Sequence, residues 1–439
     1  MKNYILITFC LSFLFVDGQV WETELLKQNP KADFIEKKDA FDQYRKQVKY
    51  TKGNGYKPYA RNLDFILKRS SSGKGIPNAQ LYREWLKEKI KIEKTKTTSS
   101  SNWVELGPIN TPIILSNGKK RGNGRINCIA FDPFDKDIMW IGSPGGGLWK
   151  TTDGGNTWST NTDNLPVIGV SSIAINPNDP QEMYITTGDA HASDTYSIGI
   201  LKSIDGGTTW DTTGIQYNVI NDKMVNKIVI HPNYTDSIFA VTDDHIMISP
   251  DGGNTWSQAI RPNGNILIGR FRDIEFKPDN PNILYAVKHT SGGSEFFKSE
   301  DRGITWYSSN NGISPTNRDR PLIAVTPANP DVVYFLLCKN DYSFHGLYKS
   351  SDNGDNWVLQ SDSPNILGRS TDGTSTGGQS WYDLSLGVST EDENLLYVGG
   401  INLWRSVDGG VNWNISGSSG NGSNYSYMHV DQHALEFNP

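Results

Sequence analysis

Short apolar runs separated by polar turn residues recur along most of this chain, from about residue 125 to residue 418. Five of the six units begin with a β-branched run that ends in proline. A turn that is usually rich in Asn and Asp follows, and then a run with an aromatic centre. Ile274–Pro278 followed by Ile283–Val287 is one such pair. Runs of four to eight residues bounded by turn residues are typical of strands. The pattern therefore predicts a series of antiparallel β-sheets.

A third run in each unit leads into the motif [ST]-x-D-x-G-x-[TN]-W, and a fourth run leaves it. The carboxylate accepts hydrogen bonds from backbone N–H groups of the turn, and the glycine supplies a positive φ. The tryptophan buries a large flat face against the sheet or the adjacent unit. The motif is therefore interpreted as a folding device, repeated at intervals of 46 to 56 residues. Its six aspartates are Asp153, Asp205, Asp251, Asp301, Asp352 and Asp408.

Four strands in about fifty residues, repeated along the chain, are typical of a β-propeller blade. The predicted fold class is all-β, a propeller with six complete four-stranded blades and the start of another. The last run, Gln432–Pro439, repeats the first-strand pattern just before the sequence stops. We therefore expect residues 102–439 to form a propeller that is truncated at its C-terminus, unless Trp103–Pro108 pairs with the last run and helps to close the ring.

The residues before the propeller follow a different pattern. Residues 19–96 carry a net charge of +9, and the later residues carry −15. Because the first 18 residues are neutral overall, the 439-residue chain has a net charge of −6. Apolar residues at three- and four-residue spacing predict helices, so residues 19–101 form a basic helical segment and linker. The segment is either a pro-segment or arm that packs on the acidic propeller, or a solvated spacer. The predicted helices are Glu22–Leu26, Phe34–Val48, Tyr59–Leu67 and Gln80–Ile92.

The first 18 residues have the form of a signal peptide. Lys2 precedes an apolar run, Tyr4–Val16, which is too short to span a bilayer, and small residues follow before Gln19. No later run is long and apolar enough to cross a membrane, so we expect a secreted or cell-surface monomer. The acidic propeller makes nucleic acid an unsuitable partner. Cys128 and Cys338 are expected to be buried thiols and not a disulfide.

The repeated motif, together with Gly124–Pro133 and Gly142–Lys150, resembles the Asp box of BNR-repeat propellers. The resemblance covers residues 102–439 and is nearest to sortilin-type exported proteins of Bacteroidetes-like bacteria. Sialidases, xyloglucanases, sortilins and photosystem assembly factors share the Asp box. The resemblance therefore implies the fold and does not by itself imply a function.

Sialidases and xyloglucanases are enzymes with Asp-box propellers, and each needs particular catalytic residues that can be looked for in this sequence. No arginine lies in the Phe-Arg-Ile-Pro context of a sialidase. In the segment that matches the xyloglucanase catalytic motif Thr-Asp-x-Gly-Gly-x-Tyr-Arg, Pro144 stands where the aspartate would be, and proline cannot exchange a proton. We therefore favour a non-catalytic module that binds protein, peptide or glycan. A glycoside hydrolase of the xyloglucanase kind, with further carboxylates outside this chain, is the alternative.

Candidate binding residues lie in the irregular insertions, since the ends of second strands often border the central opening of a propeller. The segments Thr187–Tyr196 and Thr242–His245 hold such positions. Gly377–Asp383, with Trp404 in a following strand, is interpreted either as an aromatic platform for sugars or peptides or as inter-blade packing. The candidates in these three segments are Asp189, His191, Asp194, Asp243, Asp244, Trp381 and Tyr382.

A metal site is a further hypothesis near the C-terminus. His429, Asp431 and His433 are spaced i, i+2, i+4, which places all three on one face of an extended strand. Imidazole and carboxylate groups together are suitable ligands for a divalent metal. The alternative is that the residues cap a loop before the next strand, in which case no cofactor is expected.

Overall fold

The computed structural model describes residues 25, 28–29, 34–47, 83–88, 90–91, 124–192, 195–420 and 425–438. The chain divides into two units, Met1–Thr98 and Ser99–Pro439, which are described separately. In the first unit, α2 spans Phe34–Gln47, which confirms the helix expected there. Glu36 in its first turn and basic residues in its last turn complement the helix dipole. The helices expected over 22–26 and 59–67 lie mostly or wholly outside the described residues, and residues 83–88 of the fourth are helical.

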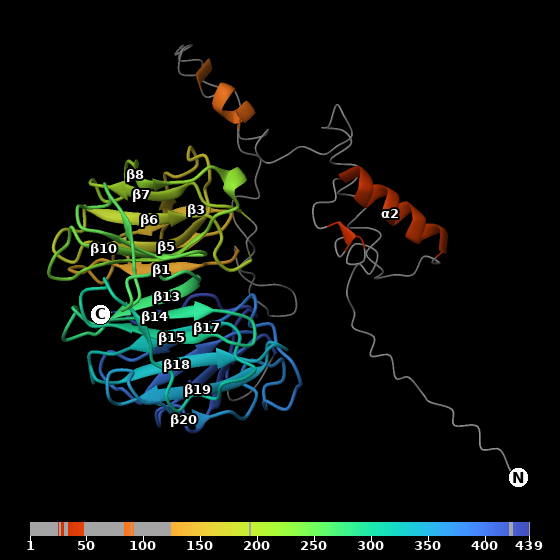
Figure 1. Ribbon diagram of the computed structural model, residues 1–439, viewed down its shortest axis with the longest axis vertical. Helices are drawn as coiled ribbons and strands as arrows, with labels where there is room; N and C mark the ends of the chain where they lie inside the picture. The colour runs from red at the N-terminus through yellow and green to blue at the C-terminus, as the bar shows by residue number, and fades with distance from the viewer. Residues whose placement is uncertain are drawn as a thin grey trace, which may run out of the picture. The chain divides into compact units, whose positions relative to one another are not determined.

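The second unit consists of six β-sheets, and in each sheet four consecutive strands pair antiparallel in chain order (Figure 1). Figure 1 colours the first three sheets from orange to green and the last three from teal to blue. In the sixth sheet a short fifth strand, β25, pairs parallel to β24. The sheets confirm the predicted all-β propeller with six complete blades.

Each blade begins with its innermost strand and continues outward in chain order. The strands of the six blades are β1 (Cys128–Phe131), β2 (Met139–Ser143), β3 (Gly147–Thr151), β4 (Ser159–Thr160); β5 (Val170–Ile175), β6 (Met183–Thr187), β7 (Gly199–Ser203), β8 (Asp211–Gln216); β9 (Val225–Ile230), β10 (Ile238–Thr242), β11 (Ile246–Ser249), β12 (Ser257–Gln258); β13 (Arg270–Phe276), β14 (Leu284–His289), β15 (Glu295–Ser299), β16 (Tyr307–Ser308); β17 (Pro321–Val325), β18 (Val333–Cys338), β19 (Phe344–Ser350), β20 (Val358–Ser361); β21 (Ser385–Val388), β22 (Leu396–Gly399), β23 (Leu403–Ser406), β24 (Asn414–Ser418) and β25 (Ser426–Tyr427).

The repeated motif forms the turn between the third and fourth strands of each blade. In the fourth blade, Ser299 Oγ donates to Asp301 Oδ1 over 2.9 Å, and the N–H of Thr305 donates to the same oxygen over 2.8 Å. The Thr305 hydroxyl donates to the other carboxylate oxygen, and Trp306 is fully buried. Burial alone would raise the pKa of Asp301, but these hydrogen bonds outweigh it and lower the pKa. All partners lie within four residues, so the motif specifies its own geometry.

Removing one of these carboxylates should destabilise the propeller without changing its fold. Asp301→Ala leaves the Thr305 N–H and hydroxyl without their acceptor, so we expect a loss of about 1–2 kcal/mol in the free energy of unfolding, measured by urea denaturation. Glu391→Ala, at an exposed position between β21 and β22, is the control and should change stability by less than about 0.5 kcal/mol. Equal effects of the two substitutions would contradict a structural role for the motif.

The propeller has two different faces. The turns after the first strands and the motif turns lie together on one face, where Gly154 N donates to Asp137 O over 2.9 Å. The turns after the second strands and the connections between blades lie on the opposite face. We call this second face the upper face. It therefore carries the insertions that were selected as candidates for binding.

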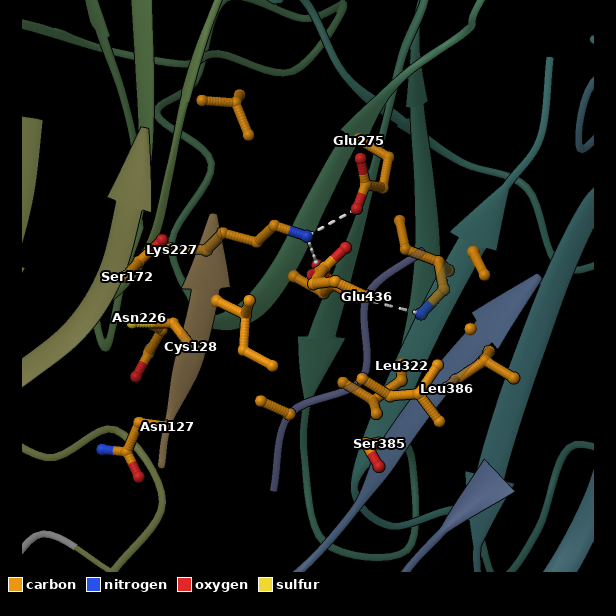
Figure 2. A pocket seen from close by; sticks show the side chains of 18 of the residues that line it. Asn127, Cys128, Ser172, Asn226, Lys227, Glu275, Leu322, Ser385, Leu386 and Glu436 are labelled. Atoms are coloured by element: carbon orange, nitrogen blue, oxygen red, sulfur yellow. Dashed lines mark hydrogen bonds and ion pairs between the residues drawn. The ribbon is translucent and has the colours of Figure 1, made fainter. Parts of the chain in front are cut away.

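A cavity of about 540 Å³ runs along the propeller axis. Side chains of the innermost strands of all six blades and of residues 433–437 line it, as Figure 2 shows for part of the wall. We call this cavity the channel. Because all six blades contribute to its wall, its lining comes from segments that are far apart in the sequence.

The C-terminal segment 432–438 lies against the innermost part of the sixth blade. Gly387 and Gly399 make room for it, since a Cβ atom added at these positions would lie 2.0 Å from Leu435 Cδ2 and 2.6 Å from Gln432 Cβ. Asn438 Nδ2 donates to Lys136 O of the first blade over 3.3 Å. The expected first strand of a further blade thus lies at the channel between the sixth and first blades, without a strand ladder. Residues 103–108 lie outside the described residues.

Two further expectations concern the cysteines and membrane spans. Cys128 and Cys338 are both free thiols, as expected, and Cys338 is fully buried. Among the helices that the structure describes, none is long and apolar enough to cross a bilayer.

Candidate functional site

Five basic side chains from five segments meet where the channel opens on the upper face. We call Arg125, His191, Arg272, Arg320 and His433 the mouth cluster. All except Arg125 line the channel. Arg125 is joined to the group through the ring of Tyr382, whose centroid lies 5.1 Å from its guanidinium carbon. The innermost strands begin at this end of the channel, so residues just before or within these strands converge here.

The two histidines of the mouth cluster are in contact and neutral. His191 Nδ1 lies 3.0 Å from His433 Nδ1 and 3.1 Å from Arg320 Nη2. Because arginine can only donate, His191 Nδ1 is an acceptor and its proton is on Nε2. Burial and the nearby arginines lower the pKa of His191 well below its usual value and that of His433 to about 3. The arginines therefore carry the positive charge of the cluster.

Arg320 fixes the backbone of the connection between β20 and β21. It is 4% exposed, and its Nη1 donates to three successive carbonyl oxygens, those of Ser380, Trp381 and Tyr382, over 3.1, 2.8 and 3.0 Å. Burial lowers the pKa of Arg320 to about 10, so the group remains charged at neutral pH. One buried cation thus determines where the two predicted aromatic residues lie.

Trp381 presents its ring to solvent on the upper face. It is 51% exposed, and its ring centroid lies 5.4 Å from that of Tyr382. Tyr382 packs edge-on against His433 at 4.5 Å. Ser380 Oγ donates to Tyr342 O over 2.8 Å, and Tyr342 is itself 38% exposed. The exposed ring of Trp381 is compatible with the expected aromatic platform, and Tyr342, which was not among the sequence candidates, is a second exposed aromatic residue on the loop that Ser380 contacts. Trp404 is 3% exposed and packs in the core, so it takes no part.

Asp189 is brought to the mouth cluster but is fully buried. It forms an ion pair with Arg125 and accepts hydrogen bonds from Asn127 Nδ2 and His191 N, over 3.2 and 3.1 Å. Burial alone would raise its pKa, but Arg125 and the backbone donors outweigh burial and lower it. Asp189 therefore holds Arg125 and the His191 loop in place and does not face a ligand. Asp194 lies outside the described residues.

Asp243 and Asp244 lie on the rim of the third blade, each with a cationic partner. Asp243 Oδ1 accepts from Arg270 Nε over 2.9 Å and from Asn226 Nδ2 over 3.2 Å. Asp244 forms an ion pair with Lys223. Neither is among the residues that line the channel.

The proposed metal ligands do not come together. Asp431 has a φ of 73°, in the left-handed region, so the extended strand that would align the three side chains does not form. His429 is exposed, Asp431 accepts from Gln379 Nε2, and His433 contacts His191. In the part of the chain that the structure describes, no group of three His, Cys, Asp or Glu side chains is placed to hold a metal ion.

A second carboxylate beside the mouth was not selected from the sequence. Asp383 is 1% exposed, and Gln379 Nε2 donates to its Oδ2 over 2.8 Å while also binding Asp431. Burial, together with the charge of Asp431, raises the pKa of Asp383 to about 7. Its position in an irregular 23-residue connection between β20 and β21, residues 362–384, gave no periodic signal.

Deeper in the channel, one lysine is surrounded by three carboxylates (Figure 2). Lys227 Nζ lies 2.7 Å from Asp273 Oδ1 and 2.5 Å from Glu275 Oε1. Glu436 extends from the C-terminal segment toward Lys227. Its side chain is accessible to solvent from within the channel, whose wall surrounds it. This burial raises the pKa of Glu436 to about 7 against the opposing effect of Lys227. The channel is thus positive at its mouth and negative below.

Pro144 lies in the turn between β2 and β3, on the upper face. Its carbonyl oxygen and that of Gly188 both lie about 3 Å from where a Cβ on Gly169 would be, so the turn borders the His191 loop. The structure therefore places position 144 near the mouth, where it supplies no acid.

Comparison with known proteins agrees with this architecture. The Sortilin-Vps10 family model, described as sortilin, neurotensin receptor 3, matches residues 244–367. These residues contain three of the six motif turns and the whole of the fourth and fifth blades. This match and the six-bladed fold together support a sortilin-type Asp-box propeller. The match covers about a quarter of the chain, in the region that includes Arg272 and Arg320.

Sequence relatives of the propeller include two xyloglucanases. Xgh74A of Acetivibrio thermocellus is 23% identical over 331 residues, covering 66% of this chain and 38% of the relative. A xyloglucanase of a Paenibacillus species is 24% identical over 337 residues, covering 66% and 31%. The chain thus spans less than two fifths of the length of these relatives. The crystal structure of the GH74 xyloglucanase from Xanthomonas campestris shares the fold, with a TM-score of 0.51, 16% identity, and coverage of 67% of this chain and 45% of that one.

Proposed function

We propose that this propeller is a non-catalytic binding module, secreted or displayed on the cell surface, whose upper face holds a glycan chain. The observation that carries the proposal is the half-exposed ring of Trp381, held by the bonds of Arg320 to the Trp381 carbonyl and its two neighbours. Xyloglucanases are among the sequence relatives, so a β-glucan with a xyloglucan-type backbone is the first ligand to test.

The fixed position of Trp381 lowers the cost of ordering a binding surface. A flat, apolar ring offers a stacking surface to the C–H face of a sugar, and its amphipathic edge tolerates water. Binding is stronger when the surface is already ordered, because each immobilised side chain otherwise costs about 0.5–1.5 kcal/mol. Arg320 orders the Trp381 backbone before any ligand arrives. Tyr342, exposed on the adjoining loop, extends the surface.

Trp381→Ala should weaken xyloglucan oligosaccharide binding about tenfold, because it removes the exposed ring and about 1.4 kcal/mol of binding free energy. Isothermal titration calorimetry with the full chain measures the change. Phe134→Ala is the matched control: Phe134 is 71% exposed, but it lies in the turn between β1 and β2, on the opposite face. Equal affinity of the Trp381 variant and the parent protein would contradict the proposal.

The alternative, a glycoside hydrolase, is favoured by one observation. Gln379 bridges Asp383, whose pKa is about 7, and Asp431, so a carboxyl group that is partly protonated at neutral pH lies near a second carboxyl group, as in acid–base pairs. Asp383 is, however, 1% exposed, which is poorly suited to direct contact with a polysaccharide. Reducing-end release from xyloglucan, abolished by Asp383→Asn and by Asp431→Asn, would support the hydrolase. Binding without release would support the module.

A further inference from the structure

Two of the guanidinium groups at the channel mouth have no carboxylate partner among the described residues. Arg125 is paired with Asp189, and Arg270, just outside the cluster, with Asp243. Arg272 and Arg320 instead donate to carbonyl and amide oxygens and to an imidazole nitrogen. Charges that are removed from water are normally paired, because an isolated buried charge is costly.

Arg272 is the less satisfied of these two groups. Its Nη1 donates to Ala190 O and, over a long 3.4 Å, to Asn226 Oδ1. Its Nε–H is buried and has no acceptor among the described residues, which is an uncommon and costly state for a charged donor. Arg320, in contrast, has its Nη1 engaged with three carbonyls and its Nη2 with His191. Arg272 therefore retains a donor that can bind a further acceptor, whereas Arg320 contributes only its positive charge to the mouth cluster.

The surroundings compensate this positive charge only in part, because Asp243 and Asp189, which act on Arg272, are paired with Arg270 and Arg125. Burial, followed by the charges of Arg270 and Arg320, lowers the pKa of Arg272 well below its usual value. Asp383 lies close enough to act on Arg320, but its own pKa of about 7 leaves it only partly ionised at neutral pH. A positive site thus exists in a propeller region whose net charge is −15. A negative group from solution would complete it.

We propose that Arg272, supported by the charge of Arg320, binds the carboxylate of a uronate residue in an acidic glycan. This inference rests on the proposed function, because Trp381 and Tyr342 would hold the sugar chain whose acidic residue enters the mouth. The channel volume of about 540 Å³ is that of an ordinary ligand pocket. The three carboxylates around Lys227 repel a second negative charge from deeper in the channel, so one acidic group is held at the mouth.

Tetragalacturonate and its fully methyl-esterified form provide matched probes, since they share a backbone and differ only in whether each carboxyl group is ionised or capped by a methyl group. Calorimetric titration of the full chain should show that the acid binds at least tenfold more tightly than the ester. Arg272→Gln should remove that difference and leave the affinity for the ester within twofold. Arg272→Lys, which keeps the charge but loses the planar donor group, should retain part of it. Arg405→Gln, on the exposed part of β23, is the control and should behave as the parent protein does.

The outcomes separate this inference from the proposed function. Equal binding of acid and ester by the parent protein, or an unchanged preference in Arg272→Gln with normal thermal unfolding, would overturn the uronate site. Arg272-dependent binding of a peptide with a free C-terminal carboxylate, without binding of tetragalacturonate, would also overturn it. Loss of ester and neutral glucan binding in Trp381→Ala tests the glycan platform independently, since that substitution leaves Arg272 in place.

Discussion

Replacing Arg320 with methionine should lower the free energy of unfolding by about 2–4 kcal/mol and abolish glycan binding. The substitution removes one buried cation and leaves the carbonyl oxygens of Ser380, Trp381 and Tyr382 without their shared donor. It also removes the donor to His191 Nδ1, so two loops lose a common anchor. The effect on binding should exceed that of Trp381→Ala, because the whole aromatic surface loses its fixed position.

Urea denaturation followed by tryptophan fluorescence, together with calorimetric titration of xyloglucan oligosaccharides, measures both effects. Arg320→Lys should restore neither, because a single ammonium group cannot reproduce the planar geometry of the guanidinium. Arg405→Met, an exposed arginine in β23, should change stability by less than about 0.5 kcal/mol. A stable Arg320→Met protein with unchanged binding would show that the connection between β20 and β21 is held by other contacts.

The second large effect concerns the dependence of stability on pH. Asp383 has a pKa of about 7 in the folded protein, above the value of 3.8 for an unperturbed aspartate. Between these two values Asp383 binds more protons in the folded state than in the unfolded state, so the contribution of Asp383 to stability falls as pH rises. The loss begins near pH 4 and is complete above pH 7. The raised pKa of Glu436, about 7 against 4.5, acts in the same direction. The lowered pKa values of His191 and His433 act in the opposite direction below about pH 6.5, so the effect of Asp383 is read from the difference between the variant and the parent protein.

Asp383→Asn should therefore stabilise the propeller at pH 8 by on the order of 3 kcal/mol and have little effect at pH 4. Asparagine keeps an oxygen that accepts from Gln379 Nε2 but carries no charge to bury. Urea denaturation at a series of pH values checks the prediction. Glu391→Gln, exposed between β21 and β22, should keep the slope of the parent protein. A parent protein whose stability rises from pH 5 to pH 8, with no gain in the Asp383 variant, would contradict it.

Some of the residues in these predictions could be selected from the sequence, and others could not. Trp381 and Tyr382 were candidates because two adjacent aromatic residues stand out in a Gly-rich connection. Arg320 fixes the loop that holds Trp381, and Arg272 is the proposed carboxylate-binding residue, yet neither lies in a recognisable motif. Their importance arises from partners far away in the chain, since Arg320 donates to residues 60 to 62 positions later and to His191, 129 positions earlier. No local pattern reports such contacts.

The surroundings of two candidate sites could not be read from local sequence. The i, i+2, i+4 rule for His429, Asp431 and His433 holds only in a continuous strand, and the left-handed backbone at Asp431 interrupts it. Asp189 was selected because it lies in a long insertion at the end of a second strand, and the structure brings it against Arg125, 64 residues earlier, and buries it fully. In both cases the side chain's surroundings come from another blade.

The sequence by itself determined the blades. The aspartate of each motif turn accepts hydrogen bonds from residues at most four positions away, and the strands are short apolar runs bounded by turn residues, so the repeat needs no distant information. Only the tertiary structure decided the site. A propeller brings the ends of all its innermost strands to one axis, and there His191 meets His433, 242 residues later. Whether a charged group at that axis is paired, buried or open to a ligand depends on which blades face each other across the channel.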